Sequence, residues 1–116
     1  MNDAEFQALK SRMINGVIAQ GEGSIENGRC KYRGPAGLKC AVGMIIPDEL
    51  YALSMDSRIM ALSDVLYDAG FELSMDQMDV IATIQHCHDA AAMSTQRDTC
   101  FIGRFTSNLQ GQGILT

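Results

Sequence analysis

The sequence predicts a helix-dominated α+β domain, with about four helices packed around a small β-hairpin or ordered loop. Apolar residues recur at helical spacing over most of the chain, which is the main signal for helices. The helical period disappears between Ser24 and Lys39, where short segments of strand-like composition flank glycines. A chain of 116 residues with 47% hydrophobic residues can fill one core and not two. We therefore expect residues 1–116 to form a single domain.

The first helix is predicted from the N-terminus to about Gln20. Asn2 or Asp3 can cap it, and Gly21 stands where a C-terminal cap residue with positive φ belongs. One apolar stripe follows the helical period and consists of Phe6, Leu9, Met13 and Val17, with Ile14 and Ile18 beside it. This stripe is expected to face the core.

A glycine-rich segment follows, and we expect a hairpin or ordered loop there. The predicted hairpin runs from Arg29 to Arg33, turns through residues 34–37 and returns over Leu38 to Cys40. Its expected inward side chains are Cys30, Tyr32, Leu38 and Cys40. A two-stranded ribbon is marginal alone, so it must pack on helices, and Gln85 and His88 are the residues expected to anchor it by hydrogen bonds.

The apolar run from Cys40 to Ile46 fits a short buried helix or a buried strand, and we favour the helix because few other strands are available for pairing. Pro47 ends this run, and a turn follows from Asp48 to Tyr51.

Two near-copies of one tetrapeptide, Leu53–Asp56 and Leu73–Asp76, are expected to start the next two helices. Each places a serine N-cap before an acidic residue in the first turn, and Gln77 completes a capping box with Ser74. The apolar stripe of the first of these helices consists of Ile59, Leu62, Leu66 and Ala69, and this helix ends at Gly70. The stripe of the second consists of Met78, Ile81, Ile84 and His88.

A last helix is predicted from Asp98 to Leu109, with Phe101, Ile102, Phe105 and Leu109 on its apolar side. Residues 110–116 are expected to form a loose tail, although Ile114 and Leu115 could dock on the core.

Charge is unevenly distributed along the chain. The net charge of −5 disfavours a general nucleic-acid binder, because phosphate contacts need Lys and Arg. Four basic residues stand between positions 29 and 39 without an acid: Arg29, Lys31, Arg33 and Lys39. The segment from Ile45 to Gln96 contains nine acidic residues and a single basic residue, Arg58. This pattern can steer a charged partner to one face of the protein. The candidate contacts are then the four basic residues and Asp64, Asp68, Asp76 and Asp79. The alternative is an acidic solvated surface beside a basic turn, without a partner.

The basic loop is the candidate site for a small anion such as a nucleotide. Gly34 and Gly37 allow close approach of a ligand to the backbone, and the guanidinium of Arg33 suits phosphate or carboxylate. The loop lacks the spacing of a Walker loop or of GxGxxG. The competing interpretation is a simple turn in which Arg33 pairs with an acid of the helical region. With the hairpin fastened to the helices, Arg33 and Lys39 are the residues expected to stay free for a partner.

The cysteines and histidines are weak candidates for a zinc site or a thiol enzyme. The possible zinc ligands are Cys30, Cys40, His86 and His88. There is no CxxC pair, and on a helix the two histidines point about 200° apart, so we predict no metal and no cofactor. Cys40 beside Lys39 could be a nucleophile, but no orienting third residue is marked. Without an export signal the thiols should stay reduced, and no apolar run is long enough for a membrane helix.

Three segments carry a family resemblance: the run Cys30–Gly43 (CKYRGPAGLKCAVG), its continuation Ile46–Tyr51, and Ile84–Asp89. Together they resemble an uncharacterised family of small proteins encoded by bacteriophages and prophages, over about residues 14–90. The chain departs from that family at Met44, where cysteine is frequent, which weakens a metal interpretation further.

The resemblance implies the cytoplasm of an infected cell and binding to host proteins, including defence proteins, and it transfers no catalytic residue. The leading hypothesis is therefore a non-enzymatic protein that modulates or inhibits a host protein by direct contact. One version displays carboxylates in place of nucleic-acid phosphates, and the chain could also self-associate.

Overall fold

The protein is described from a computed structural model, which places residues 1–57, 60–94 and 100–115. Its elements in chain order are α1 (Asp3–Gln20), β1 (Ile25–Glu26), β2 (Arg29–Cys30), α2 (Leu62–Asp68), α3 (Met75–Ser94) and α4 (Phe101–Gly111). Short 3-10 turns lie at Pro35–Gly37, Val42–Met44, Asp48–Leu50 and Leu53–Asp56. The predicted helix-dominated α+β class with a small antiparallel hairpin is confirmed.

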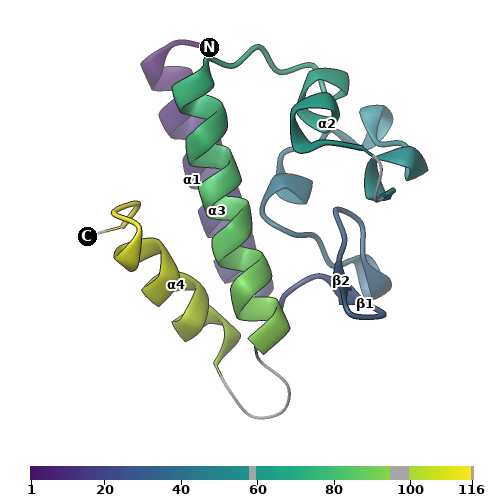
Figure 1. Ribbon diagram of the computed structural model, residues 1–116, viewed down its shortest axis with the longest axis vertical. Coiled ribbons are helices and arrows are strands. Elements are labelled where there is room, and N and C mark those ends of the chain that lie inside the picture. The colour runs from purple at the N-terminus through teal and green to yellow at the C-terminus, as the bar shows by residue number, and fades with distance from the viewer. Residues whose placement is uncertain (58–59, 95–99, 116) are drawn as a thin grey trace.

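Helix α3 is the centre of the arrangement. Figure 1 shows α1 and α3 side by side, with α4 packed on one flank of α3 and the segment from β1 to α2 on the other. The core lies between these layers and includes Met13 and Val17 of α1, Ile84 of α3 and Phe105 of α4, all fully buried. Burial of such side chains is the main stabilising term in a domain of this size.

Helix α1 forms as predicted, because both of its ends carry local capping signals. The Asn2 side chain accepts a hydrogen bond from the Glu5 amide at 2.8 Å, and the Glu5 carboxylate accepts one from the Asn2 amide at 3.0 Å. At the other end Gly21 adopts φ 82° and its amide donates to the Val17 carbonyl. The apolar stripe is buried as expected, except that Ile18 stays exposed.

The predicted position of the hairpin was wrong. The strands are β1 and β2, with Ile25 opposite Cys30 and Glu26 opposite Arg29. Asn27 and Gly28 both adopt positive φ between them, the conformation for which an Asn-Gly pair is best suited. Residues Pro35–Gly37 instead form a 3-10 turn, in which the Leu38 amide donates to the Pro35 carbonyl at 3.1 Å. The Gly34 amide also donates to the Leu38 carbonyl, at 2.8 Å. The stretch after β2 is thus an ordered loop. The run Cys40–Ile46 contains a buried 3-10 turn, in line with the preference for a helix over a strand.

The predicted helix start at Ser54 was also wrong, whereas that at Ser74 is confirmed. Residues Leu53–Asp56 form a 3-10 turn, and α2 begins only at Leu62. The expected stripe residue Ile59 lies outside the described part of the chain. Ser74 and Gln77 form the predicted capping box, with side-chain to backbone hydrogen bonds of 3.1 and 3.0 Å. Gly70 adopts φ 91°, and the following Phe71 amide donates to the Leu66 carbonyl, as in a glycine-terminated helix.

The C-terminal helix has the predicted apolar face, with Phe101, Phe105 and Leu109 buried. Its predicted start at Asp98 lies outside the described residues. The segment after it is not a loose tail as far as residue 115, because the Ile114 amide donates to the Leu109 carbonyl and both Ile114 and Leu115 pack on the core. None of the described helices combines the length and the apolar character needed to cross a membrane.

Candidate functional site

Asp56 fixes the loop that follows β2. One carboxylate oxygen accepts a hydrogen bond from the Tyr32 amide at 2.7 Å, and the other accepts from the Arg33 amide at 3.3 Å and the Tyr51 hydroxyl at 2.6 Å. The Asp56 carbonyl also accepts from the Arg29 guanidinium at 3.1 Å. Such charge-assisted bonds are stronger than neutral ones, so one carboxylate organises most of the loop. Sequence analysis assigned no such role to Asp56.

Arg33 is used inside the chain, so the expectation that it stays free for a partner was wrong. Its guanidinium donates to the carbonyls of Gly43 and Ile46 at 2.7 and 2.8 Å and to the Asp48 carboxylate at 2.9 Å. It also lies 5.1 Å from the centre of the Tyr51 ring. The side chain is only 18% exposed. The structure thus agrees with the alternative interpretation, a turn whose arginine pairs with an acid, although that acid is Asp48 of a 3-10 turn and not a residue of an α-helix.

Packing within the chain explains Gly34 and Gly43, and Gly37 adopts a positive φ of 77° with open space around it. A Cβ atom on Gly34 would collide with the Ser24 hydroxyl, and one on Gly43 would collide with the Tyr32 carbonyl. Lys39 keeps a partly exposed amine 3.7 Å from Asp48, a surface ion pair of small energetic value. The arrangement therefore lacks the converging free donors that a nucleotide-binding loop would present, since the guanidinium of Arg33 is already bonded.

A hydrogen-bond network connects the residue before β1 and the 3-10 turn at Val42 to α3. The Ser24 amide donates to Nε2 of His88 at 3.2 Å, and Nδ1 of His88 lies 2.9 Å from the Asp89 carboxylate. Gln85 donates to the same carboxylate oxygen at 2.8 Å and accepts from the Val42 amide at 2.8 Å. Ser24 and His88 are fully buried. His88 thus anchors the residue before β1, as predicted, whereas Gln85 anchors Val42 and not the hairpin.

The network also decides the tautomer of His88. Because Nε2 accepts the Ser24 amide, the ring proton resides on Nδ1 and is donated to Asp89. Both ring nitrogens are therefore occupied. His88 therefore holds the Ser24 segment against α3 and has no free ring nitrogen that could act as a general base.

The same geometry argues against a metal site. Cys30, His88 and Asp89 place one potential ligand atom each within 4.8 Å of one another. A metal ion on Nδ1 of His88 would move the ring proton to Nε2, opposite the Ser24 amide, so that two donors would face each other. His86 is exposed and Cys40 is fully buried, so the four predicted candidates do not form one ligand set. These donors do not fit a resident metal.

The inner cysteines are held as neutral thiols. Burial raises the pKa of Cys30 far above its ordinary value, and the Asp89 carboxylate raises it further by charge and by a hydrogen bond. Burial also raises the pKa of Cys40 to about 12 and raises that of Cys87. Thiolates are the nucleophilic form, so the geometry opposes a thiol enzyme built on Cys40. All four cysteines are free of disulfides.

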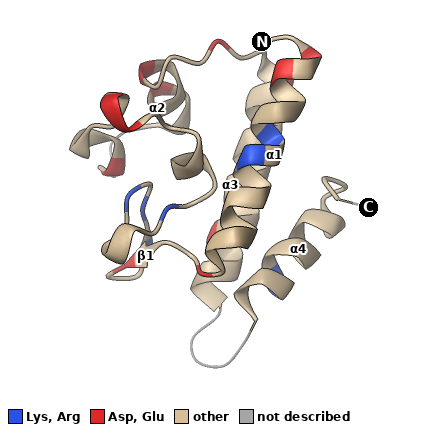
Figure 2. Cartoon of the chain, turned by 180° about the vertical axis from the view of Figure 1, so that it is seen from behind, with Lys and Arg blue, Asp and Glu red and all other residues tan. Residues whose placement is uncertain are grey.

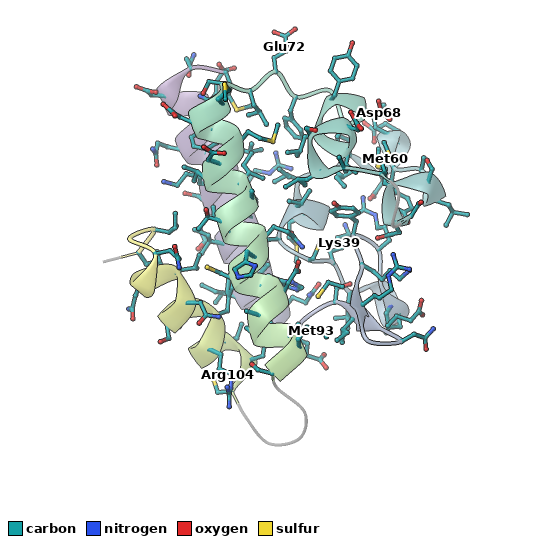
Figure 3. All side chains as sticks on the ribbon, viewed as in Figure 1. Lys39, Met60, Asp68, Glu72, Met93 and Arg104 are labelled. Carbon is teal, nitrogen blue, oxygen red and sulfur yellow. The ribbon has the colours of Figure 1, made fainter. Side chains whose placement is uncertain are left out.

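A cavity of about 320 Å³ opens between the loop and α3. Its polar lining includes Arg29, Tyr32, Asp56 and Asp89, and its apolar lining includes Met55, Met60, Leu62 and Ala82. Figure 3 shows Met60 beside the α2 segment, on the side of the molecule away from α4. A volume of this size is at the lower end of the range for ligand pockets. Sequence analysis did not find the cavity, because its walls come from four separate segments of the chain.

The four predicted acidic residues all lie on the surface. Asp64 and Asp68 belong to α2, and Asp76 and Asp79 to the first turns of α3. Figure 2 shows acidic residues on and around α2, and basic residues on α1 and near β1. In Figure 3 the labelled Asp68 and Glu72 lie at the outer edge of this region. Three large apolar side chains between residues 53 and 75 are also exposed: Leu53 at 85%, Tyr67 at 77% and Met75 at 85%.

Comparison with known proteins gives no match to a family model, to a curated protein or to a solved structure.

Proposed function

We propose that the chain is a non-enzymatic binding protein that docks on a basic surface of a partner protein. The contact region is its acidic surface, which we define as Asp64, Asp68, Asp76 and Asp79 with Glu49 and Glu72. The observation that supports this proposal is the combination of these exposed carboxylates with exposed Leu53, Tyr67 and Met75. Interfaces commonly place aromatic residues and methionine at their centre within a polar rim.

The partner class follows from charge complementarity. Among the described residues, none of the six carboxylates of the acidic surface forms an ion pair, so all remain available to a basic partner. Basic protein surfaces are typical of nucleic-acid-binding proteins, and a row of carboxylates can occupy the place of phosphates on them. The resemblance to phage-encoded proteins suggests a host protein, including defence proteins, met in the host cytoplasm.

Charge reversal of the acidic surface tests the proposal. A partner would first be identified by affinity purification from infected cells and then purified. We expect replacement of Asp64, Asp68, Asp76 and Asp79 by Lys to weaken its binding at least about tenfold, because opposite charges become like charges. Added salt should weaken binding to the unmodified chain.

The matched control reverses Glu22 and Glu26, which are also exposed but lie near β1. It should leave the affinity within about twofold. Equal affinity of the fourfold acidic-surface variant and the unmodified chain, with both folded, would show that this surface is not the contact.

A further inference from the structure

The lining of the cavity between the loop and α3 combines apolar and charged side chains. Its apolar part consists of Met55, Met60, Leu62 and Ala82. Its charged part consists of the carboxylates of Asp56 and Asp89 and one guanidinium, that of Arg29. Two carboxylates against one guanidinium leave the lining with a net negative charge, so an anionic ligand is disfavoured there and a cationic one is favoured.

Asp89 is the carboxylate most able to meet a ligand. Both oxygens of Asp56 are already engaged by Tyr32, Arg33 and Tyr51. At Asp89 the hydrogen bonds from His88 and Gln85 go to one oxygen, Oδ1, and the Cys30 thiol also bonds to this carboxylate. Its side chain is 37% exposed, although the neighbouring His88 is fully buried. A hydrogen-bonded carboxylate held on a rigid helix is a preorganised acceptor for a cation.

We infer that this cavity receives a Lys or Arg side chain of the partner protein. This inference rests on the binding function proposed above. The methylene stem of such a side chain packs on the apolar part of the lining while its charged head meets Asp89. Methionine side chains adapt readily to an inserted group, so Met55 and Met60 can adjust to this stem. Leu62, the first residue of α2, lines the cavity, and Asp64 of the acidic surface follows two residues later on the same helix.

The test uses probes that need no partner. The unmodified chain would be titrated with N-acetyl-arginine amide and N-acetyl-lysine amide, with the uncharged N-acetyl-norleucine amide as control, and followed by amide chemical shifts. We expect saturable shifts at Cys30, Gln85 and Asp89 with a Kd on the order of 1 mM for at least one cationic probe. The norleucine probe should give no saturable shift at these amides.

Two variants locate the binding. Asp89→Asn keeps the acceptor but removes the charge, and it should weaken binding of the cationic probe about tenfold. Ala82→Leu fills the cavity from an exposed position of α3, so it should abolish binding without disturbing the core. Ala8→Leu, at an exposed position of α1, is the matched control and should bind like the unmodified chain.

The absence of saturable shifts with both cationic probes would overturn the inference, as would equal binding of the norleucine probe or unchanged binding by folded Ala82→Leu. These outcomes are separate from failure of the proposed function, which is measured with the purified partner and the charge-reversed acidic surface. If Ala82→Leu abolished probe binding but left partner affinity unchanged, the cavity would bind free amines and not a side chain of the partner. That result would overturn the assignment to a partner side chain.

Discussion

The two copies of Leu-Ser-Met-Asp have opposite roles in the folded chain. In the first copy Met55 is 2% exposed, and the Asp56 carboxylate binds the loop after β2. In the second copy Met75 is 85% exposed, and Asp76 is an exposed residue in the first turn of α3. The same four residues thus form a 3-10 turn that supports the site in one place and start a long helix in the other.

The residues around each copy explain the difference. Ser74 is followed at the third position by Gln77, which completes a capping box, whereas the same position after Ser54 is Ser57. The first copy also lies next to a loop whose amides need an acceptor, and Asp56 supplies it. Local capping therefore determines the conformation of the second copy, and long-range hydrogen bonding determines that of the first.

The largest difference between the copies should come from their methionines. Met55→Ala leaves a hole in the core and should lower the free energy of unfolding by about 3 kcal/mol. Met75→Ala removes an exposed side chain and should change it by less than about 0.5 kcal/mol. Urea unfolding followed by circular dichroism measures both. Similar losses for the two variants would contradict the contrast in burial.

The aspartates should differ next. Asp56→Ala leaves the Tyr32 and Arg33 amides without their acceptor and should cost about 2 kcal/mol. Asp76→Ala loses only a favourable interaction with the helix dipole and should cost about 0.5 kcal/mol. Amide hydrogen exchange gives a local readout, because the Tyr32 amide should exchange faster in Asp56→Ala and not in Asp76→Ala. An unchanged rate at Tyr32 in Asp56→Ala would remove the assigned role of this carboxylate.

The serines should show a smaller effect with the opposite order. Ser74→Ala breaks the capping box of α3 and should cost about 1 kcal/mol. Ser54 makes no side-chain capping bond in its turn, so Ser54→Ala should cost less than about 0.5 kcal/mol. Denaturant unfolding compares the two, and Gln77→Ala should repeat part of the Ser74 loss. A larger loss at Ser54 than at Ser74 would mean that the first copy is capped in solution.

Sequence reasoning succeeded where the deciding contacts are local. The caps of α1 and α3 depend on residues three apart, Asn2 with Glu5 and Ser74 with Gln77. The position of the hairpin was also encoded locally, in Asn27-Gly28, the strongest short-range hairpin signal, and that signal was overlooked in favour of residues 34–37.

The candidate site depends on contacts between distant parts of the chain, which no local pattern reveals. The Tyr32 amide meets a carboxylate 24 residues away, and the Ser24 amide meets an imidazole 64 residues away. The residue types at Gln85 and His88 were enough to predict anchoring, because buried polar groups require partners. Which oxygen or nitrogen each one meets follows only from the packing of the loop on α3.

The finest distinction between the two aspartates lies in the titration of Tyr51. Burial, followed by the hydrogen bond to Asp56 and its negative charge, raises the pKa of Tyr51 to about 12 from an ordinary value of 10.0. A raised pKa means that folding favours the neutral phenol, so this contribution to stability is complete below pH 10 and is lost as the pH rises through about 12. Asp56→Asn removes the charge and should move the appearance of tyrosinate absorbance to lower pH, whereas Asp76→Asn should leave the curve unchanged. Tyr51→Phe identifies the component of the curve that belongs to this residue. If that component titrates at the same pH in Asp56→Asn as in the unmodified chain, the shift comes from burial alone, and the bond between Tyr51 and Asp56 does not distinguish the first copy from the second.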